Sequence, residues 1–170
     1  RLVWQKGIEY LLDAIPSVLS RYENARFLVV GDGPEKSNLL KKVTSLKVEK
    51  QVIFTGFIID IKPLLNIVDT VVIPSVREGF PMITLEAMAM AKPIVATNIP
   101  GINEQVAHER SGMLVQARNP EAIAKAIIVL LQNKDMAHRL GLKARCTVEK
   151  NFTIEKTLEE TKKLYTSLLH

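Results

Sequence analysis

Two glutamates, eight positions apart, are the residues of this sequence best suited to bind a ligand rich in hydroxyl groups. Glu78 lies in a glycine-containing loop after a strand-like run, and Glu86 lies in the helix that follows. A carboxylate only accepts hydrogen bonds and can take them from two neighbouring hydroxyls, such as those of a sugar or a ribose. The spacing alone equally allows a solvated Glu78 and a Glu86 that hydrogen-bonds within the fold.

Backbone amides between these two acids could bind a phosphate. Met82 and Ile83 open the predicted helix, directly after Pro81, and the first amides of a helix have no acceptor within it. Such amides point at a ligand placed beyond the helix end and favour an anion there. The segment thus offers contacts to hydroxyl, phosphate and hydroxyl groups in series, which is the order of polarity in a nucleoside-diphosphate sugar.

Two other segments could bind phosphate. Arg1 and Lys6 precede a predicted helix that starts after Gly7, and fixed cations beside free helix amides attract anions. Cations are also common on protein surfaces before helices. The turn 31–34 (GDGP) follows a strand-like run, but it lacks the third glycine of the dinucleotide fingerprint, so a tight turn without a ligand explains it equally well.

The elements that must position these residues alternate between strand-like and helical patterns. Apolar runs predict strands, and spacings of three and four predict helices. This alternation indicates an α/β, Rossmann-like three-layer domain, in which a parallel sheet is flanked by helices and ligands bind beyond the carboxyl ends of the strands. The predicted strands are 25–30, 51–55, 69–73, 93–97 and 113–115, and the predicted helices are 8–21, 35–46, 60–68, 81–91, 101–107, 120–132 and 134–168, the last with breaks near residues 141 and 151.

Composition excludes several classes of protein. Of the 170 residues, 23 are Lys or Arg and 18 are Asp or Glu, so the net charge of +5 favours anionic partners. Aromatic residues are few and do not alternate with basic ones, which argues against binding of nucleic acid. The single Cys146 excludes an internal disulfide, and His108, His138 and His170 are too far apart in sequence to suggest a metal site. No apolar run is long enough to cross a membrane, and we expect a cytoplasmic protein.

Five sequence runs, in order, resemble those of family 4 retaining glycosyltransferases, which have the two-domain GT-B fold. They are Arg1 with Lys6-Gly7, VVGDGP, FTGF, PSVREGFPMITLEAMAMAKPIVAT and SGMLV. The resemblance covers essentially the entire chain and implies that it is the C-terminal half of a GT-B enzyme. It further implies a nucleotide-sugar-binding domain over residues 1–152 and a C-terminal helix over 153–170 that packs against an N-terminal domain with no counterpart in this sequence.

The resemblance also implies roles for individual residues. Glu78 matches a catalytic glutamate beside the donor sugar, and Glu86 matches one that holds the ribose hydroxyls. Arg1 and Lys6 match cations that bind the diphosphate, and the backbone of Ile58 matches a position that reads the nucleobase. The donor-binding set implied in this way is Arg1, Lys6, Ile58, Gly79, Phe80, Pro81, Met82, Ile83 and Glu86.

The activity implied by the resemblance is transfer of a hexosyl group with retention of configuration. The donor would be a UDP- or GDP-linked sugar and the acceptor a glycan, a lipid or a small molecule, with no metal ion or organic cofactor. Many proteins that this chain resembles build lipid-linked glycans, so the resemblance also implies peripheral association with the cytoplasmic face of a membrane. Two alternatives remain: a non-catalytic nucleotide-binding module on the same fold, and a Rossmann-type dehydrogenase or nucleotide sensor.

Two residues depart from the family pattern. Pro81 replaces a common glycine, and because proline has no N–H it cannot donate to a sugar hydroxyl. Ala91 replaces a common glycine at the end of the helix that contains Glu86. A left-handed alanine would be strained, so we expect that helix to end in another way.

Overall fold

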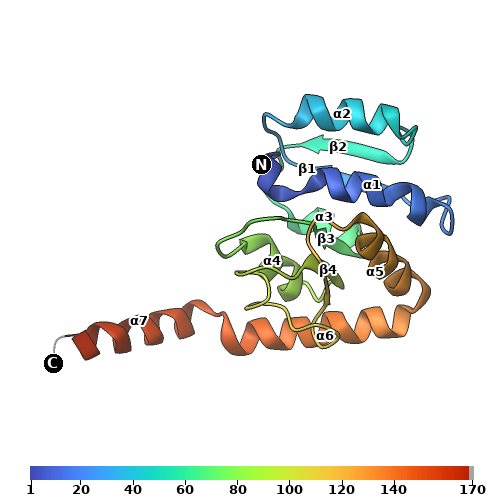
Figure 1. Cartoon of the computed structure of the whole chain (residues 1–170). Coiled ribbons are helices and arrows are strands. Elements are labelled where there is room, and N and C mark those ends of the chain that lie inside the picture. Colours follow the sequence, from blue (N-terminus) through green and yellow to red (C-terminus); the bar gives the residue numbers. More distant parts are fainter. Residues whose placement is uncertain (169–170) are drawn as a thin grey trace.

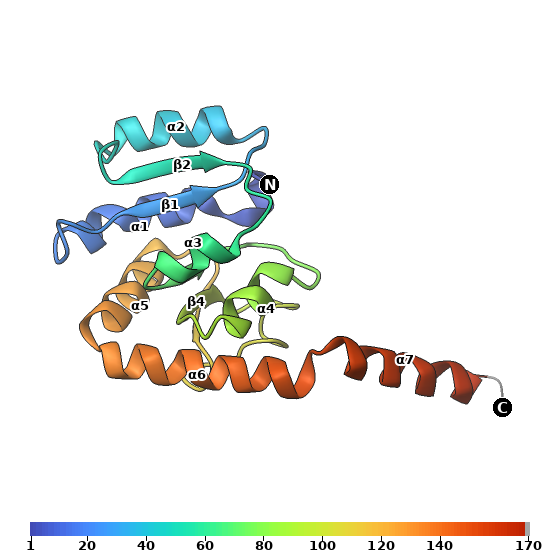
Figure 2. The same ribbon diagram turned by 180° about the vertical axis from the view of Figure 1, so that it is seen from behind.

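Strands and helices alternate along the chain as far as β4, and β5 and three helices follow (Figures 1 and 2). The computed structural model describes residues 1–168. The strands are β1 (Phe27–Val30), β2 (Val52–Gly56), β3 (Val71–Ile73), β4 (Ile94–Thr97) and β5 (Met113–Val115). The helices are the short 3₁₀ helix η1 (Trp4–Lys6), α1 (Ile8–Leu19), α2 (Lys36–Ser45), α3 (Lys62–Ile67), α4 (Met82–Ala89), α5 (Pro120–Gln132), α6 (Lys134–Asn151) and α7 (Ile154–Leu168).

The strands are parallel, as predicted, but they form two sheets rather than one. β1 pairs with β2, and β4 lies between β3 and β5. Helix α1 connects the two sheets because its apolar residues face both ways. Leu11 and Ala14 pack in the cluster that contains β4 and α5, whereas Leu12 and Ile15 pack in the cluster that contains β1, β2 and α2. The Rossmann-like α/β class is therefore confirmed, with its sheet divided between β1 and β3.

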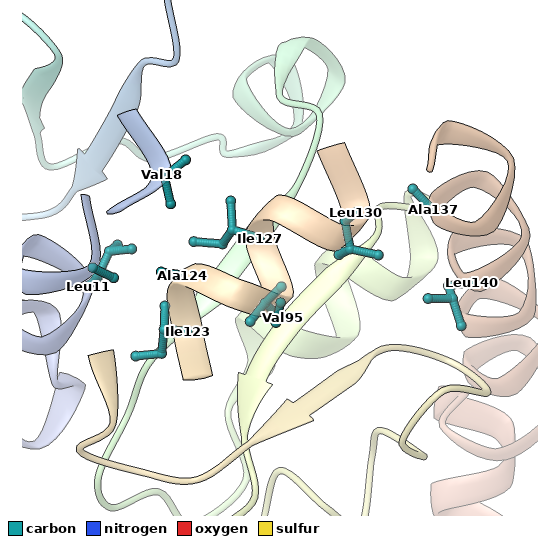
Figure 3. Packing of buried hydrophobic residues seen from close by; sticks show 11 residues of the cluster. Leu11, Val18, Val95, Ile123, Ala124, Ile127, Leu130, Ala137 and Leu140 are labelled. Carbon is teal, nitrogen blue, oxygen red and sulfur yellow. The ribbon is translucent and has the colours of Figure 1, made fainter. Parts of the chain in front are cut away.

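Strand β4 is the centre of the larger sheet, and both of its faces are covered. Val95 packs among residues of α1, α5 and α6, including Ile127 and Leu140 (Figure 3). Its neighbours Ile94 and Ala96 point the opposite way, as alternation along a strand requires, into a cluster with residues of α4. All four residues of β4 are buried, which is typical of a parallel strand between two layers of helices.

Two predictions about where helices lie were wrong. Residues 101–107 form turns instead of a helix, and Gly101 has a φ of +83°, which a right-handed helix does not allow. Helix α6 continues through Gly141 without a break. A side chain there would overlap the carbonyl oxygen of Ala91, so this glycine lets α6 lie close to the end of α4. The predicted break near residue 151 is confirmed, because α6 ends at Asn151 and α7 begins at Ile154.

Helix α7 extends away from the rest of the chain (Figures 1 and 2). All of its described residues are exposed, including Ile154, Leu158, Tyr165 and Leu168. It lies within the predicted segment 153–170, of which residues 169 and 170 lie outside the described part, and the division into two segments and the packing of α7 against a further domain stay predictions. None of the helices within residues 1–168 combines the length and the apolar character needed to span a bilayer.

Helix α4 ends with a left-handed alanine, contrary to our prediction. Ala91 has a φ of +53°, its amide donates to the carbonyl of Met88, and the amide of Lys92 donates to the carbonyl of Ala87. This pair of hydrogen bonds is a Schellman motif, which satisfies two carbonyls at the helix end. The motif and the close packing of Gly141 therefore outweigh the steric cost of a left-handed alanine.

Replacing Ala91 with glycine is expected to stabilise the domain by about 0.5–1 kcal/mol. Left-handed backbone costs alanine about 1–2 kcal/mol, and the greater entropy of glycine in the unfolded state offsets part of this gain. Urea unfolding would measure the change. The control is Ala89→Gly, at an exposed position in the last turn of the same helix, which should destabilise by about 1 kcal/mol. A loss of stability in both variants would contradict the strain at Ala91.

Candidate functional site

Two segments that are about 70 residues apart in sequence lie side by side at the carboxyl end of β3. Gly7 has a φ of +61°, and a side chain there would overlap the carbonyl oxygen of Pro74. The amide of Val76 donates to the carbonyl of Gln5 at 2.8 Å. This close approach places Lys6, which directly precedes Gly7, beside the loop that follows β3.

Lys6 and Glu78 form a direct ion pair across this junction. The ammonium Nζ of Lys6 lies 2.7 Å from Oε1 of Glu78, and the side chains are 34% and 10% exposed. The hydroxyl of Ser75 donates to the same Oε1, also at 2.7 Å. Glu78 is therefore not the freely solvated residue that its spacing also allowed. It is held by two donors, one of them charged, at the end of the strand.

The first turn of α4 provides free amides next to this pair. Pro81 precedes the helix in an extended conformation, and no side chain caps the helix start. The amides of Met82 and Ile83 therefore have no acceptor within the helix, whereas the amide of Thr84 donates to the carbonyl of Pro81. Fixed N–H groups beside the ammonium of Lys6 form an arrangement suited to a phosphate.

A cavity of about 420 Å³ joins these groups. Six of the predicted residues line it, together with apolar residues of β1, β3 and α3. The predicted residues that line it are Arg1, Lys6, Glu78, Pro81, Met82 and Ile83, together with Ser75, which was not predicted.

Four of the predicted residues do not line this cavity: Ile58, Gly79, Phe80 and Glu86. Glu86 is exposed on α4. The ring of Phe80 lies 5.8 Å, between centroids, from the ring of Phe152, just after α6, so Phe80 connects the loop to the helical layer. Ile58 follows β2, in the other sheet. The structure thus brings the diphosphate-binding candidates together with Glu78 and leaves the ribose and base candidates outside the cavity.

The turn 31–34 contacts the chain itself. A side chain on Gly33 would overlap the backbone of Leu2, and the amide of Leu2 donates to the carbonyl of Asp32 at 2.8 Å. Hydrogen bonds from Lys36 and from the Gly33 amide hold the pKa of Asp32 below its ordinary value. Gly33 therefore makes room for Leu2, next to Arg1, as in a tight turn that packs against its own chain.

Sequence reasoning missed three buried polar residues behind the site. Ser75 is 1% exposed, and its carbonyl accepts a hydrogen bond from the hydroxyl of Thr97 at 2.5 Å. Gln105 is 2% exposed, and its amide Nε2 lies 3.4 Å from the carbonyl of Pro81. Ser75 and Thr97 are hydroxyl residues at the carboxyl ends of neighbouring strands, where side chains of a parallel sheet meet a ligand. That position was the available signal, whereas Gln105 lies in the segment predicted as a helix.

No metal centre is formed by the described side chains: nowhere in residues 1–168 do three or more His, Cys, Asp or Glu side chains come together. The positive groups at the site are those of Arg1 and Lys6, and the α4 amides add partial charge. Fold and site together define a Rossmann-like domain with an edge whose charges and amides suit an anion.

Comparison with known proteins identifies the family. Residues 1–133 match the family model of glycosyl transferases group 1, and the chain belongs to this family. It is 35% identical over 167 residues to an uncharacterized glycosyltransferase of Methanocaldococcus jannaschii, covering 97% of this chain and 43% of the relative. The chain therefore spans less than half the length of that relative.

Solved structures agree with the GT-B assignment. Anabaena HepE in complex with UDP superimposes with a TM-score of 0.91 at 26% identity, over 98% of this chain and 47% of that protein. The C-terminal domain of a glycosyl transferase group 1 family protein from Francisella tularensis superimposes with a TM-score of 0.82 at 28% identity, over 91% of this chain and 83% of that one. The predicted family and the predicted fold are thus confirmed.

Proposed function

We propose that this chain binds the nucleoside-diphosphate-sugar donor of a retaining glycosyltransferase. The observation that carries the proposal is the convergence of Lys6, Glu78 and the free amides of Met82 and Ile83 on one cavity at the carboxyl edge of the sheet. A diphosphate needs cations and N–H donors, and a sugar needs an acceptor for its hydroxyls. Both kinds of group line the same cavity, so a single ligand could contact them together.

Each group has a chemical task in the proposed reaction. Arg1, Lys6 and the α4 amides stabilise the negative charge that develops on the departing nucleoside diphosphate, which is electrostatic preorganisation. Glu78 accepts from sugar hydroxyls and stabilises positive charge on the reacting sugar carbon. Attack on the same face as the leaving phosphate retains configuration without a second carboxylate as nucleophile, in contrast to retaining glycosidases.

Several parts of the proposal concern the donor. Glu86, exposed on α4, would bind the ribose hydroxyls, and the backbone of Ile58 would contact the base. The loop residues Gly79 and Phe80 would border the sugar. HepE was solved with UDP, which supports a uridine nucleotide, and GDP is the alternative. The proposed reaction needs no metal ion, because Arg1, Lys6 and the α4 amides would themselves face the leaving group.

The remaining parts concern the complete enzyme. The acceptor, a glycan, a lipid or a small molecule, would be bound by an N-terminal domain, and the hexosyl group would be transferred between the two domains. A lipid-linked acceptor would place the enzyme at the cytoplasmic face of a membrane. In the absence of that domain, this chain is expected to bind the donor with little or no turnover.

Calorimetric titration of the chain with UDP, GDP, ADP and NADH at low salt tests the proposal. We expect saturable binding of UDP or GDP, with the corresponding sugar nucleotide competing for the same site, because the phosphate and hydroxyl contacts are shared. Low salt is chosen because phosphate contacts are screened at high ionic strength. Tight binding of NADH without competition by a sugar nucleotide would instead favour a dehydrogenase, and binding of none of the four would contradict the assigned site.

A further inference from the structure

The two carboxylate oxygens of Glu78 have different surroundings. Oε1 accepts hydrogen bonds from both Lys6 and Ser75, each at 2.7 Å. Within residues 1–168, no hydrogen-bond donor contacts Oε2. A carboxylate has lone pairs on both oxygens, so Oε2 is the oxygen that remains to accept from a ligand in the cavity.

A second donor on Oε1 determines the orientation of the carboxylate. The terminal torsion of a glutamate side chain is broad and has no sharp minimum, and a lysine is a flexible point charge that follows its partner. The Lys6 bond alone would therefore allow the carboxylate plane to turn. Ser75 adds a short, charge-assisted hydrogen bond from a side chain that is almost fully buried, and two donors from different directions fix the plane.

Ser75 is itself held in place from beneath. Its carbonyl accepts from the hydroxyl of Thr97, which is 0% exposed at the end of β4. The next amide, that of Val76, donates to Gln5. The backbone at Ser75 is thus held to the neighbouring strand on one side and to the segment of Lys6 on the other. These contacts fix the position from which the Ser75 side chain extends.

We propose that Ser75 is a positioning residue for donor binding: its hydroxyl holds Oε1 of Glu78 so that Oε2 faces the sugar, and Thr97 fixes the backbone of Ser75. This inference rests on the proposed function, in which Glu78 contacts the donor sugar. Both act through Glu78: the Ser75 hydroxyl donates to Oε1, and the hydroxyl of buried Thr97 donates to the carbonyl of Ser75. They therefore affect recognition of the sugar and leave the diphosphate contacts intact.

The test compares a sugar nucleotide with the free nucleotide. UDP-glucose and UDP, and GDP-mannose and GDP, are titrated into the wild-type chain and into Ser75→Ala, Glu78→Ala and the double variant. Ser75→Ala removes the charge-assisted hydrogen bond to Glu78 and is expected to weaken binding of the sugar nucleotide about fivefold. Binding of the free nucleotide is expected to change less than about twofold. In the Glu78→Ala background, Ser75→Ala is expected to have no further effect.

Thr97 provides a matched pair of variants. Thr97→Ser retains the hydroxyl and should bind the sugar nucleotide like the wild type, whereas Thr97→Val keeps the shape, loses the hydroxyl and should reproduce Ser75→Ala. Thermal unfolding of each variant verifies that it folds, and a crystal structure of Ser75→Ala is expected to show the Glu78 carboxylate rotated.

The outcomes separate this inference from the proposed function. Equal weakening of sugar nucleotide and free nucleotide by Ser75→Ala, additive losses in the double variant, or an unmoved carboxylate would each overturn the positioning role while donor binding stands. Unchanged sugar-nucleotide affinity in Glu78→Ala would overturn the proposed sugar contact, and with it the role of Ser75. Absence of nucleotide binding in the wild type would overturn both.

Discussion

Replacing Lys6 with alanine is expected to weaken binding of the nucleoside diphosphate roughly 10- to 100-fold. A charge-assisted hydrogen bond contributes about 1.5–3 kcal/mol, and Lys6 pairs with Glu78 and lines the same cavity as Met82 and Ile83 of α4. The loss should be largest at low salt and should shrink as ionic strength rises, because screening weakens the lost attraction. Titration of UDP and GDP at two salt concentrations measures it.

The same substitution should also lower stability. Glu78 is only 10% exposed, and without Lys6 its charge retains the Ser75 hydroxyl as its donor. An under-satisfied charge costs free energy, here about 1–2 kcal/mol because Lys6 is itself about one third exposed and water can partly replace it. Urea unfolding would measure this loss.

Lys36→Ala is the matched control for this experiment. Lys36 forms an equally short pair with Asp32, at 2.8 Å, but both side chains are more exposed and neither lines the cavity. Exposed pairs contribute little, so stability and nucleotide affinity should both stay close to wild type. Equal losses of affinity in the two variants would mean that only the overall charge of the chain matters, and the assignment of Lys6 to the diphosphate would fail.

Local patterns predicted much of the fold correctly. The bounds of β5 and α5 agree with the prediction, because each has a clear apolar pattern and α5 opens with Asn119 and a proline, which are typical of a helix start. Segment 101–107 also has helical spacing, but Gly101 must contact Gly79 closely. Gly141 shows the reverse case. Glycine disfavours the interior of a helix, but this glycine lies inside α6 because the end of α4 packs closely against it. In both cases tertiary packing overrode local preference.

The members of the candidate site were predictable only in part, and its geometry less so. Lys6, Glu78 and the α4 amides each had a recognisable local signal. Their convergence depends on the contact between Gly7 and Pro74. This contact joins segments about 70 residues apart, and no periodic pattern in the sequence predicts it. Ser75 carries no local signal beyond its place at a strand end. Which oxygen of Glu78 stays free is determined by hydrogen bonds that exist only in the folded chain.

Replacing Gly101 with alanine is expected to destabilise the domain by about 2–4 kcal/mol. Its φ of +83° lies in the region that favours glycine, which costs alanine about 1–2 kcal/mol. The new methyl group would also overlap the carbonyl oxygen of Gly79, and such overpacking costs about 1–3 kcal/mol. The midpoint of urea unfolding should fall with an unchanged slope, as for a loss of stability without a change in the surface exposed.

Gly79→Ala separates the two sides of this contact. A side chain on Gly79 would meet no atom within 4 Å, and the φ of Gly79 is not among the positive values. The stability of the Gly79→Ala variant should therefore stay within about 0.5 kcal/mol of wild type. Gly101→Ala should in addition weaken sugar-nucleotide binding at temperatures where it remains folded, because a displaced Gly79 carries Glu78 with it. Wild-type affinity in folded Gly101→Ala would show that the turn at residue 101 stabilises the domain without positioning the loop of Glu78.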